Sequence, residues 1–388
     1  MPAFSLDPVQ TAWCAELRAM AAERLRPLAE KGEPGRVNRP LVAELGRLGL
    51  LRRLFTSGAL DLCLMRESLA HACTEAETAL ALQGLGAHPV HAYGTPAQRE
   101  RWLSPVTEGR AVAAFALSEP GAGSDAAALE LRAEGGAAGE AESPSAEPDG
   151  PARWRLTGEK CWISNAPEAD FCTVFARTTP GAGARGVTAF LVPADRPGLT
   201  GTALDMLSPH PIGALAFDGV PVTADDVLGE VDRGFRVAMD TLNLFRPSVG
   251  AFAVGMAQAA LDVAVAHAAG RRAFGRPLSE FQAVAHALAD AATRTQAARL
   301  LVYEAASRYD ADPAAPGVTG AAAMAKLYAT ETAQAVVDQA VQVLGARALV
   351  RGHLLEHLYR EVRAPRIYEG TSEIQRTVIA RELFRALP

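Results

Sequence analysis

The chain has 388 residues, of which 49% are hydrophobic and 21% charged, so it can bury a large core and divide into two or three domains. Its formal net charge is −6 and no basic stretch dominates any region, which argues against a nucleic-acid-binding surface. No apolar run of 18 residues predicts a membrane span, and the start of the chain lacks the pattern of a signal peptide.

Five cysteines are scattered along the chain without a CxxC pair. Isolated thiols in odd number favour a reducing compartment over a disulfide framework or a zinc site. We therefore expect a cytoplasmic protein.

Residues 1–109 are expected to form a helical domain. Apolar residues recur at intervals of three and four in residues 12–29 and 40–55, which is the pattern of amphipathic helices. Asn38 is placed to cap the second of these helices. A further helix is predicted over Glu67–Leu82, and Pro96 opens a short one.

Residues 110–228 are expected to form a β domain. Short β-type runs separated by Gly, Pro, Asn and Asp cover residues 111–118, 153–164, 171–178, 186–193 and 214–222. Residues 134–151 are rich in Gly, Ala, Ser, Glu and Pro, a composition that predicts a flexible insertion without chemistry.

Residues 229–388 return to the helical period in long, Ala-rich segments, which favours an antiparallel helical bundle. The predicted fold class is therefore α+β and mostly α. Its order is a helical N-terminal domain, a β-sheet middle domain and a C-terminal four-helix bundle.

Three segments are candidates for chemistry. Residues 117–125 (LSEPGAGSD) contain glycines that let successive N–H groups point at one anion, although a plain glycine-rich turn has the same composition. Residues 160–165 (KCWISN) place a Trp where it could lie against a flat cofactor or pack in a core. In residues 367–376 (IYEGTSEIQR), Ser372 and Gln375 form a predicted capping box, which puts Glu369 in a tight loop before a helix that begins near Glu373.

His353, Glu356 and His357 fit the H-x-x-E-H pattern, which could hold zinc if a third ligand lay nearby. A solvated helix face is the simpler interpretation of so short a pattern. No metal site is predicted.

Together the segments resemble the acyl-CoA dehydrogenase family over nearly the whole chain. The matching residues are Phe115–Ser124, Trp162–Ser164, Gly234–Met239, Arg246, Arg271–Gly275, Gln282, Gln342–Gly345 and Tyr368–Gln375. The resemblance implies a fold of this kind, FAD as the cofactor and an acyl-CoA as the substrate.

The resemblance also implies roles for individual residues. It assigns the subunit's own FAD to Phe115, Leu117, Ser118, Gly123, Ser124, Trp162, Ile163 and Ser164. It adds cofactor contacts from Arg271, Phe274, Gln282, Gln342, Val343, Gly345 and Ala346, most of them reaching the FAD of a neighbouring subunit, and places Thr371 and Glu373 near the adenine. It assigns the acyl-CoA site to Ser124, Asn243, Arg246 and Gly370.

By the same resemblance, Glu369 is the base that removes the α-proton while the β-hydrogen passes as hydride to flavin N5, giving the 2-enoyl-CoA. The thioester oxygen is expected to receive hydrogen bonds from the FAD ribitol and the Glu369 N–H. Some members carry the base just before the arginine matched by Arg246. Here that position is Phe245, which cannot accept a proton.

The resemblance further implies an electron-transfer flavoprotein as acceptor and a homotetramer built as a dimer of dimers. Ala273, Ala346, Phe115 and Glu373 depart from the usual Thr, Gly, Tyr and Gln, and each alters one cofactor contact. The sequence around Glu75 lacks the arginine of glutaryl-type members, which disfavours a dicarboxyl substrate.

Three alternatives stay open. One is an oxygen-reactive acyl-CoA oxidase or flavin monooxygenase on the same fold. Another is a dehydrogenase of acyl groups tethered to a carrier protein. The last is a binding protein without catalysis, which the presence of Glu369 and the glycine loop disfavours.

Overall fold

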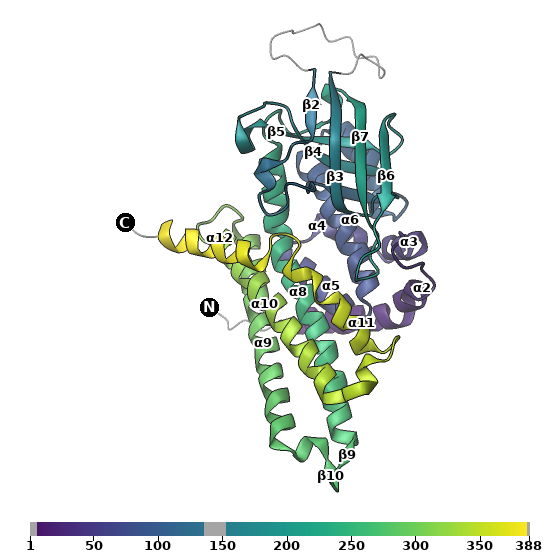
Figure 1. Cartoon of the computed structure of the whole chain (residues 1–388), viewed down its shortest axis with the longest axis vertical. Helices are drawn as coiled ribbons and strands as arrows, with labels where there is room; N and C mark the ends of the chain where they lie inside the picture. Colours follow the sequence, from purple (N-terminus) through teal and green to yellow (C-terminus); the bar gives the residue numbers. More distant parts are fainter. Residues whose placement is uncertain (1–5, 136–152, 386–388) are drawn as a thin grey trace. The chain divides into compact units, whose positions relative to one another are not determined.

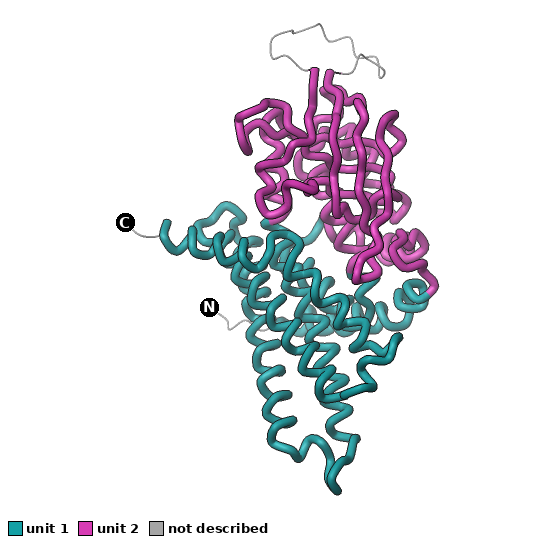
Figure 2. The backbone as a smooth tube through the Cα atoms, viewed as in Figure 1, with its two compact units in different colours: residues 1–30, 56–77, 243–388 teal, residues 31–55, 78–242 magenta. Residues whose placement is uncertain are grey.

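The computed structural model describes residues 6–135 and 153–385, so most of the insertion predicted at 134–151 lies outside the described residues. The chain forms two compact units (Figure 2). The helical unit comprises residues 1–30, 56–77 and 243–388, and the sheet unit comprises residues 31–55 and 78–242. The units interleave along the sequence, whereas the boundaries predicted at 109 and 228 cut it into consecutive segments. Those boundaries stay a prediction.

Most helices belong to the two ends of the chain, and all strands but the short β9 and β10 belong to its middle (Figure 1). Helices of the helical unit are α1 (Pro8–Met20), α2 (Arg26–Ala29), α5 (Ala59–Ala72), α9 (Gln282–Ala311), α10 (Val318–Leu344), α11 (Leu354–Glu361) and α12 (Ser372–Arg385). The sheet unit holds α3 (Arg39–Arg47), most of α4 (Leu50–Thr56) and α7 (Pro96–Thr107). Two helices contribute to both units: α6 (Thr74–Tyr93) and α8 (Gly234–Gly270).

The described residues of the sheet unit form an eight-stranded mixed sheet. Its strands are β1 (Ala113–Ala116), β2 (Arg132–Glu134), β3 (Trp154–Ser164), β4 (Phe171–Arg177), β5 (Val187–Pro193), β6 (Leu199–Ala203), β7 (Ile212–Val222) and β8 (Val227–Leu228). Their order is β6-β7-β3-β2-β4-β5-β8, with β1 pairing in parallel with β4. All five predicted β-type runs contain a strand. The strands missed by the sequence are the short β2 and β8 and the largely exposed β6, which have no run of apolar residues.

Two neighbouring strands of the sheet, β4 and β5, are buried on both faces. In β4, Phe171 and Phe175 point into a cluster that includes Ala87 and Val90 of α6. The intervening Cys172 and Val174 face a second cluster, which contains side chains of β3 and β7. Alternate side chains leave opposite faces of a strand, so burial on both faces requires the continuous apolar run seen in β4.

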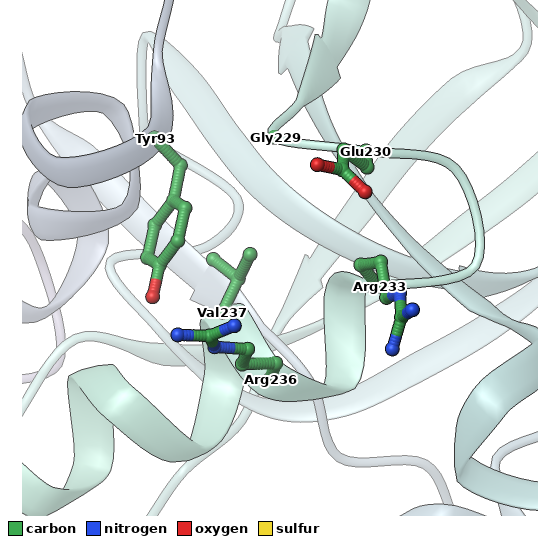
Figure 3. Close-up of a pocket in the computed structure, with 6 residues that line it drawn as sticks. All are labelled: Tyr93, Gly229, Glu230, Arg233, Arg236 and Val237. Atoms are coloured by element: carbon green, nitrogen blue, oxygen red, sulfur yellow. The ribbon is translucent and has the colours of Figure 1, made fainter. Parts of the chain in front are cut away.

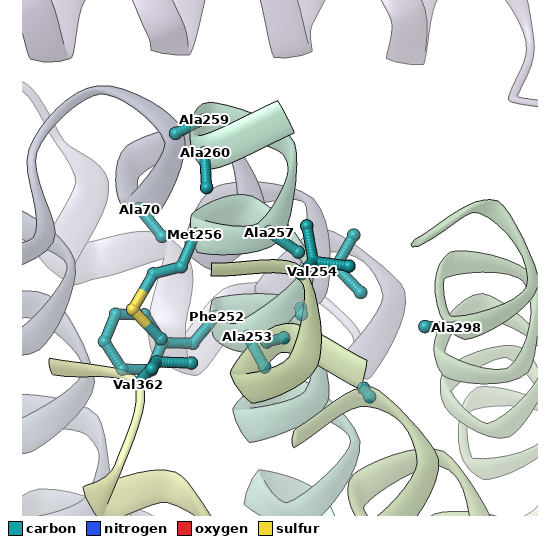
Figure 4. Packing of buried hydrophobic residues seen from close by; sticks show 14 of the residues in the cluster. Ala70, Phe252, Ala253, Val254, Met256, Ala257, Ala259, Ala260, Ala298 and Val362 are labelled. Carbon is teal, nitrogen blue, oxygen red and sulfur yellow. The ribbon is translucent and has the colours of Figure 1, made fainter. Parts of the chain in front are cut away.

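The helical unit is built on small residues. Its core cluster contains alanines from α5, α8, α9 and α10, together with larger side chains such as Phe252, Met256 and Val362 (Figure 4). Among the described residues, α8 alone is long and apolar enough to cross a membrane by length and composition. However, 72% of its most apolar window is buried within the protein, as in a core helix. The predicted order of helical, sheet and helical regions, and with it the fold class, is confirmed.

The predicted helix over Glu67–Leu82 is wrong, because α5 ends at Ala72 and α6 begins at Thr74. Cys73 between them is extended, with φ −158° and ψ 101°. Arg26 Nε donates to the Ala72 carbonyl at 2.9 Å and so satisfies one of the carbonyls left open at the end of α5. The interruption depends on this contact between distant residues. The predicted cap of α3 is confirmed, since Asn38 Oδ1 accepts from the Leu41 N–H at 3.1 Å.

We expect Gly255→Ala to destabilise the helical unit. An added Cβ would lie 2.4 Å from the Glu67 carbonyl oxygen and 2.7 Å from the Ala70 Cβ, so α5 and α8 would have to separate. Overpacking of this kind costs about 1–3 kcal/mol, which exceeds the gain of about 1 kcal/mol in helix propensity. Denaturant unfolding measures the change. Gly270→Ala is the control, because its Cβ would meet nothing within 4 Å; equal effects of the two substitutions would contradict the close approach.

Candidate active site

Glu369 lies in a left-handed turn between the short helix Ala364–Arg366 and α12. Glu369 has φ 52° and Gly370 has φ 92°. A residue with a Cβ is strained in this region, by about 1–3 kcal/mol, and strain of this kind occurs often at functional sites. A Cβ on Gly370 would also meet the Gln375 Nε2 atom at 2.7 Å. The turn therefore requires glycine at position 370 and holds a glutamate in a strained conformation beside it.

The carbonyl groups of this turn are held by three side-chain donors. Gln375 Nε2 donates to the carbonyls of Glu369 and Gly370 at 3.1 and 2.9 Å. Arg246 Nε donates to the Glu369 carbonyl at 3.3 Å, and Lys326 Nζ donates to the Gly370 carbonyl at 2.7 Å. These hydrogen bonds fix the strained backbone.

The predicted capping box at Ser372 and Gln375 is wrong in its residues. The Oγ1 of Thr371 accepts from the Ile374 N–H at 3.3 Å and caps α12, whereas the Ser372 hydroxyl donates to Glu331. Gln375 is instead used to hold the turn. The helix therefore begins at Ser372, one residue before the predicted start.

The Glu369 carboxylate is partly removed from water. Its Oε2 atom is buried and has no hydrogen-bond partner among the described residues. Burial raises the pKa of Glu369, while the nearby charges of Arg66, Lys326 and Arg246 oppose that increase. An unpartnered carboxylate oxygen with a raised pKa, next to three cations, has the properties of a general base.

Arg66 and Glu77 form a buried ion pair beside this carboxylate. Arg66 is 3% exposed and Glu77 is wholly buried, and the guanidinium also donates to the Ser248 hydroxyl at 2.7 Å. Neither residue was predicted from the sequence. No local signal marks them, because Arg66 is followed by Glu67 and Ser68, and Glu77 lies in the polar stretch 74–78.

The predicted acyl-CoA residues of the helical unit lie together. Arg246 Nη1 donates to the Asn243 Oδ1 at 3.0 Å, and the same guanidinium reaches the Glu369 carbonyl. Burial lowers the pKa of Arg246, and Glu369 opposes that shift. Phe245 is 1% exposed within the core. The structure thus brings Asn243, Arg246, Glu369 and Gly370 into one cluster. Ser124 belongs to the sheet unit.

In the sheet unit, a buried lysine holds the glycine loop at its root. Lys160 is 0% exposed, and its Nζ lies 2.9 Å from the Leu117 carbonyl and 2.7 Å from Glu119 Oε1. Glu119 in turn accepts from the N–H groups of Glu130 and Leu131 at 2.5 and 2.9 Å. Burial lowers the pKa of Lys160 to about 8. The beginning of the loop is therefore fixed, while Cβ atoms on Gly121 or Gly123 would meet nothing within 4 Å.

Trp162 is positioned by an irregularity in β3. The register of β3 against β7 shifts between Lys160 and Ile163, and Trp162 has φ 58°. Bulges of this kind re-aim a side chain, and the indole is 50% exposed while Ile163 is buried. Ser118 and Ser164 are partly exposed, and Phe115 packs against Phe175 at 4.9 Å between ring centroids. An open glycine loop and an exposed indole fit a phosphate-bearing cofactor with a flat ring. Leu117 and Ile163 could offer it only backbone groups.

Three family models match the chain in succession. The N-terminal, middle and C-terminal domain models of acyl-CoA dehydrogenase cover residues 7–110, 114–220 and 232–384. The chain belongs to the acyl-CoA dehydrogenase family. It is thus an FAD-dependent oxidoreductase that dehydrogenates acyl-CoA thioesters.

Individual relatives match almost from end to end. The chain is 39% identical to the short-chain specific acyl-CoA dehydrogenase of Bos taurus mitochondria, over 95% of this chain and 88% of that protein. It is similar to butyryl-CoA dehydrogenase from Megasphaera elsdenii, with 33% identity, a TM-score of 0.87 and coverage of 98% and 100% of the two chains. A chain in the structure of the electron-transferring flavoprotein of Acidaminococcus fermentans matches with 32% identity and a TM-score of 0.87, covering 98% and 99%.

Other predicted cofactor residues of this acyl-CoA dehydrogenase lie on exposed parts of the helical unit. A hairpin of β9 (Arg272–Ala273) and β10 (Arg276–Pro277) presents Phe274, which is 95% exposed with φ 51°. Arg271, Gln282, Gln342, Gly345, Ala346 and Glu373 are exposed, and Val343 and Thr371 are partly exposed. Their roles toward FAD stay a prediction.

The histidine pattern is used in local packing. His353 Nδ1 accepts from the Leu355 N–H at 3.1 Å and caps α11. His357 Nε2 lies 2.6 Å from the Thr74 hydroxyl and 3.6 Å from Glu75. The face that the sequence analysis took to be solvated is therefore partly in contact with α6. Among the described residues, no group of three or more His, Cys, Asp or Glu is arranged to hold a metal ion.

A pocket of about 380 Å³ lies in the sheet unit, and none of its lining residues is a predicted site residue (Figure 3). Its lining residues are Tyr93, Gly229, Glu230, Arg233, Arg236 and Val237. Arg236 lies 3.5 Å from Asp240, which also accepts from the Tyr93 hydroxyl. Cations and carboxylates thus balance one another here, and no ligand class follows.

We expect Lys160→Met to destabilise the sheet unit strongly, because the buried Glu119 carboxylate would lose its cation. Removing one partner of a buried ion pair costs about 3–5 kcal/mol. The unfolding free energy from denaturant titration measures this loss, and FAD retention should fall with it. Arg132→Met is the control, since its pair with Glu134 in the same sheet is 61% exposed on both sides and such pairs contribute about 0–1 kcal/mol. A loss no larger for Lys160→Met than for Arg132→Met would show that the buried pair is not needed.

Proposed function

We propose that Glu369 is the base of this acyl-CoA dehydrogenase and that its substrate is a short-chain acyl-CoA. The observation that carries the first part is the buried Oε2 of Glu369, which has no hydrogen-bond partner in the described part of the chain and on which three cations act electrostatically. The second part is supported by the relatives named for short-chain and butyryl substrates.

Each residue of the cluster has a proposed task. Glu369 takes the α-proton, and its raised pKa makes it a stronger base than an exposed carboxylate once it is ionised. Arg246, Lys326 and Arg66 supply positive charge near the thioester oxygen as that atom becomes negative, and their positions are fixed before reaction. Bound FAD would supply the acceptor for the β-hydrogen and its electron pair.

The proposed residues for FAD in the sheet unit are the loop from Phe115 to Ser124 and the segment from Trp162 to Ser164. The N–H groups and hydroxyls of the loop suit a pyrophosphate, and the exposed face of Trp162 suits a flavin ring. An electron-transfer flavoprotein is the proposed acceptor. The five free cysteines, four of them buried, support a cytoplasmic location.

Glu369→Gln should lower turnover about 10²–10⁴-fold, because glutamine keeps the shape of the side chain but cannot accept the α-proton. The assay follows a dye acceptor with a panel of acyl-CoA esters, beginning with butyryl-CoA. Glu16→Gln is the matched control, since Glu16 lies in α1 of the same unit, is exposed and has no predicted role in the site. Normal flavin reduction by the Glu369→Gln variant would exclude Glu369 as the base. The same panel, repeated with carrier-bound thioesters and with oxygen as acceptor, separates the two alternative enzymes.

We further propose a homotetramer, assembled as a dimer of dimers, in which the hairpin at Phe274 contacts another copy. The Phe274 side chain is 95% exposed, and its backbone is in the left-handed region. Burying this apolar ring against another copy would stabilise the assembly.

Phe274→Ser should therefore weaken assembly and FAD retention together. Light scattering and the flavin-to-protein ratio measure the two effects. Leu207→Ser is the control, because Leu207 is 62% exposed but lies in the sheet unit, away from the predicted cofactor residues in the sequence. An oligomer that persists in the Phe274→Ser variant, with full FAD content, would contradict the proposed contact.

A further inference from the structure

Lysine is rare in this chain and is found in unusual places. Only three of the 38 basic residues are lysines, at positions 31, 160 and 326. Lys31 is exposed, whereas Lys160 and Lys326 are both 0% exposed. Lysine is almost never fully buried without a partner. The two buried lysines therefore call for separate explanations.

Lys160 has such a partner in Glu119, but Lys326 does not. The described residues give the Lys326 ammonium no carboxylate within ion-pair distance. Its one hydrogen bond in the structure goes to the Gly370 carbonyl, at 2.7 Å. Burying an ammonium group without an ion pair is costly, and burial lowers the pKa of Lys326 to about 8. A residue with this cost contributes poorly to stability.

The carbonyl that Lys326 holds belongs to the residue after the proposed base. Both Glu369 and Gly370 have positive φ, so their conformation depends on the donors that satisfy their carbonyls. Gln375 and Arg246 are the other donors, and Lys326 is the only one that holds Gly370 with a full charge. A shift of this turn would move the Glu369 carboxylate and its N–H together.

We propose that Lys326 is a positioning residue for the dehydrogenation. Its protonated ammonium holds the Gly370 carbonyl, keeps the Glu369 backbone in the left-handed conformation, and adds positive charge next to the reacting thioester. This inference rests on the proposed function of Glu369 as the base.

The charge on Lys326 should make activity depend on alkaline pH. Glu369 from the turn and Arg246 from α8 act on Lys326 electrostatically, as do Glu331 of its own helix and Glu373 of α12. The carboxylates favour its protonated form and Arg246 opposes it. As the pH rises through about 8, Lys326 loses its proton, and the turn loses both its charged donor and one positive charge. The rate should fall on this alkaline side.

The acidic side of the profile has a different origin. The raised pKa of Glu369 sets the pH below which the base is protonated. Of the cations that oppose this increase, Arg66 of α5 has the largest effect. The rate should therefore rise with pH through the Glu369 pKa and fall again above about 8. The two limbs belong to different residues and can be removed separately.

The test uses FAD-loaded full-length protein and butyryl-CoA as the probe. Anaerobic flavin reduction in a single turnover and exchange of the α-protons with D₂O are followed from pH 6 to 10. Lys326→Gln keeps a neutral donor, and Lys326→Arg keeps a charge that is not lost below pH 12. Lys31→Gln is the control at the exposed lysine. FAD content and unfolding temperature are measured for every variant.

We expect Lys326→Gln to lower both rates roughly 10²-fold at pH 7, since a small misplacement of a catalytic group has effects of this size. KM should change little, and the alkaline limb should disappear. Lys326→Arg should also lose that limb. At pH 9–10 it should therefore retain a larger fraction of its own pH 7 rate than the wild type does. A merely structural role would lower the unfolding temperature but leave the alkaline limb in place.

The inference is overturned if Lys326→Gln retains the wild-type rate and limb with normal FAD content. If Lys326→Gln does not fold, the Lys326→Arg variant decides the question: an alkaline limb unchanged from the wild type would also overturn the inference. Failure of the proposed function of Glu369 gives a different result from failure of the inference about Lys326. In that case the wild type exchanges no α-protons, or Glu369→Gln retains exchange.

Discussion

The cost of removing the Glu369 carboxylate from water is the constraint on which the site depends. Burial raises its pKa, and the nearby cations oppose that increase and so favour the ionised form that a base requires. Too many cations would make it a poor proton acceptor. The helical unit resolves this with Arg66, Arg246 and Lys326, which come from α5, α8 and α10.

The three cations are held by different means, which limits their effect on Glu369. Arg66 is neutralised in part by Glu77, and Arg246 is anchored by the amide oxygen of Asn243. Within the described residues, the Lys326 ammonium donates only to the Gly370 carbonyl. Bringing three helices close enough for this requires small residues at their crossings. At Gly255 the backbone of α8 passes so near to the Glu67 carbonyl that no Cβ fits, which relates the alanine- and glycine-rich core directly to the electrostatics of the base.

The sequence allowed prediction of the elements whose signals are local. The continuous apolar runs of β4 and β5 and the cap at Asn38 are of this kind, as is the glycine-bearing turn at Gly370. The break at Cys73 could not be predicted, because it involves Arg26, 47 positions earlier in the chain, capping α5 through Ala72. The predicted cap of α12 was Ser372, but the cap in the structure is Thr371. The prediction failed because the Ser372 hydroxyl donates to Glu331 and the Gln375 amide donates to the turn, and both contacts join residues that the local pattern does not relate. Arg66, Glu77 and Lys326 acquire a function only through contacts between helices, which no spacing along the chain records.

The two buried lysines show how similar contacts can serve different ends. Each donates to a backbone carbonyl at the root of a functional segment, Lys160 to Leu117 and Lys326 to Gly370, and burial lowers the pKa of each to about 8. Lys160 is also paired with Glu119, whose second oxygen is satisfied by a backbone N–H, so the contact forms a closed network. Deprotonation there would leave a buried carboxylate, and the network resists it. Lys326 has no ion-pair partner among the described residues, and the opposing charge that acts on it most strongly is that of Glu369. Its protonation is therefore coupled to the state of the base: when Glu369 takes up the α-proton and becomes neutral, the positive charge of Lys326 is left to the negative thioester oxygen.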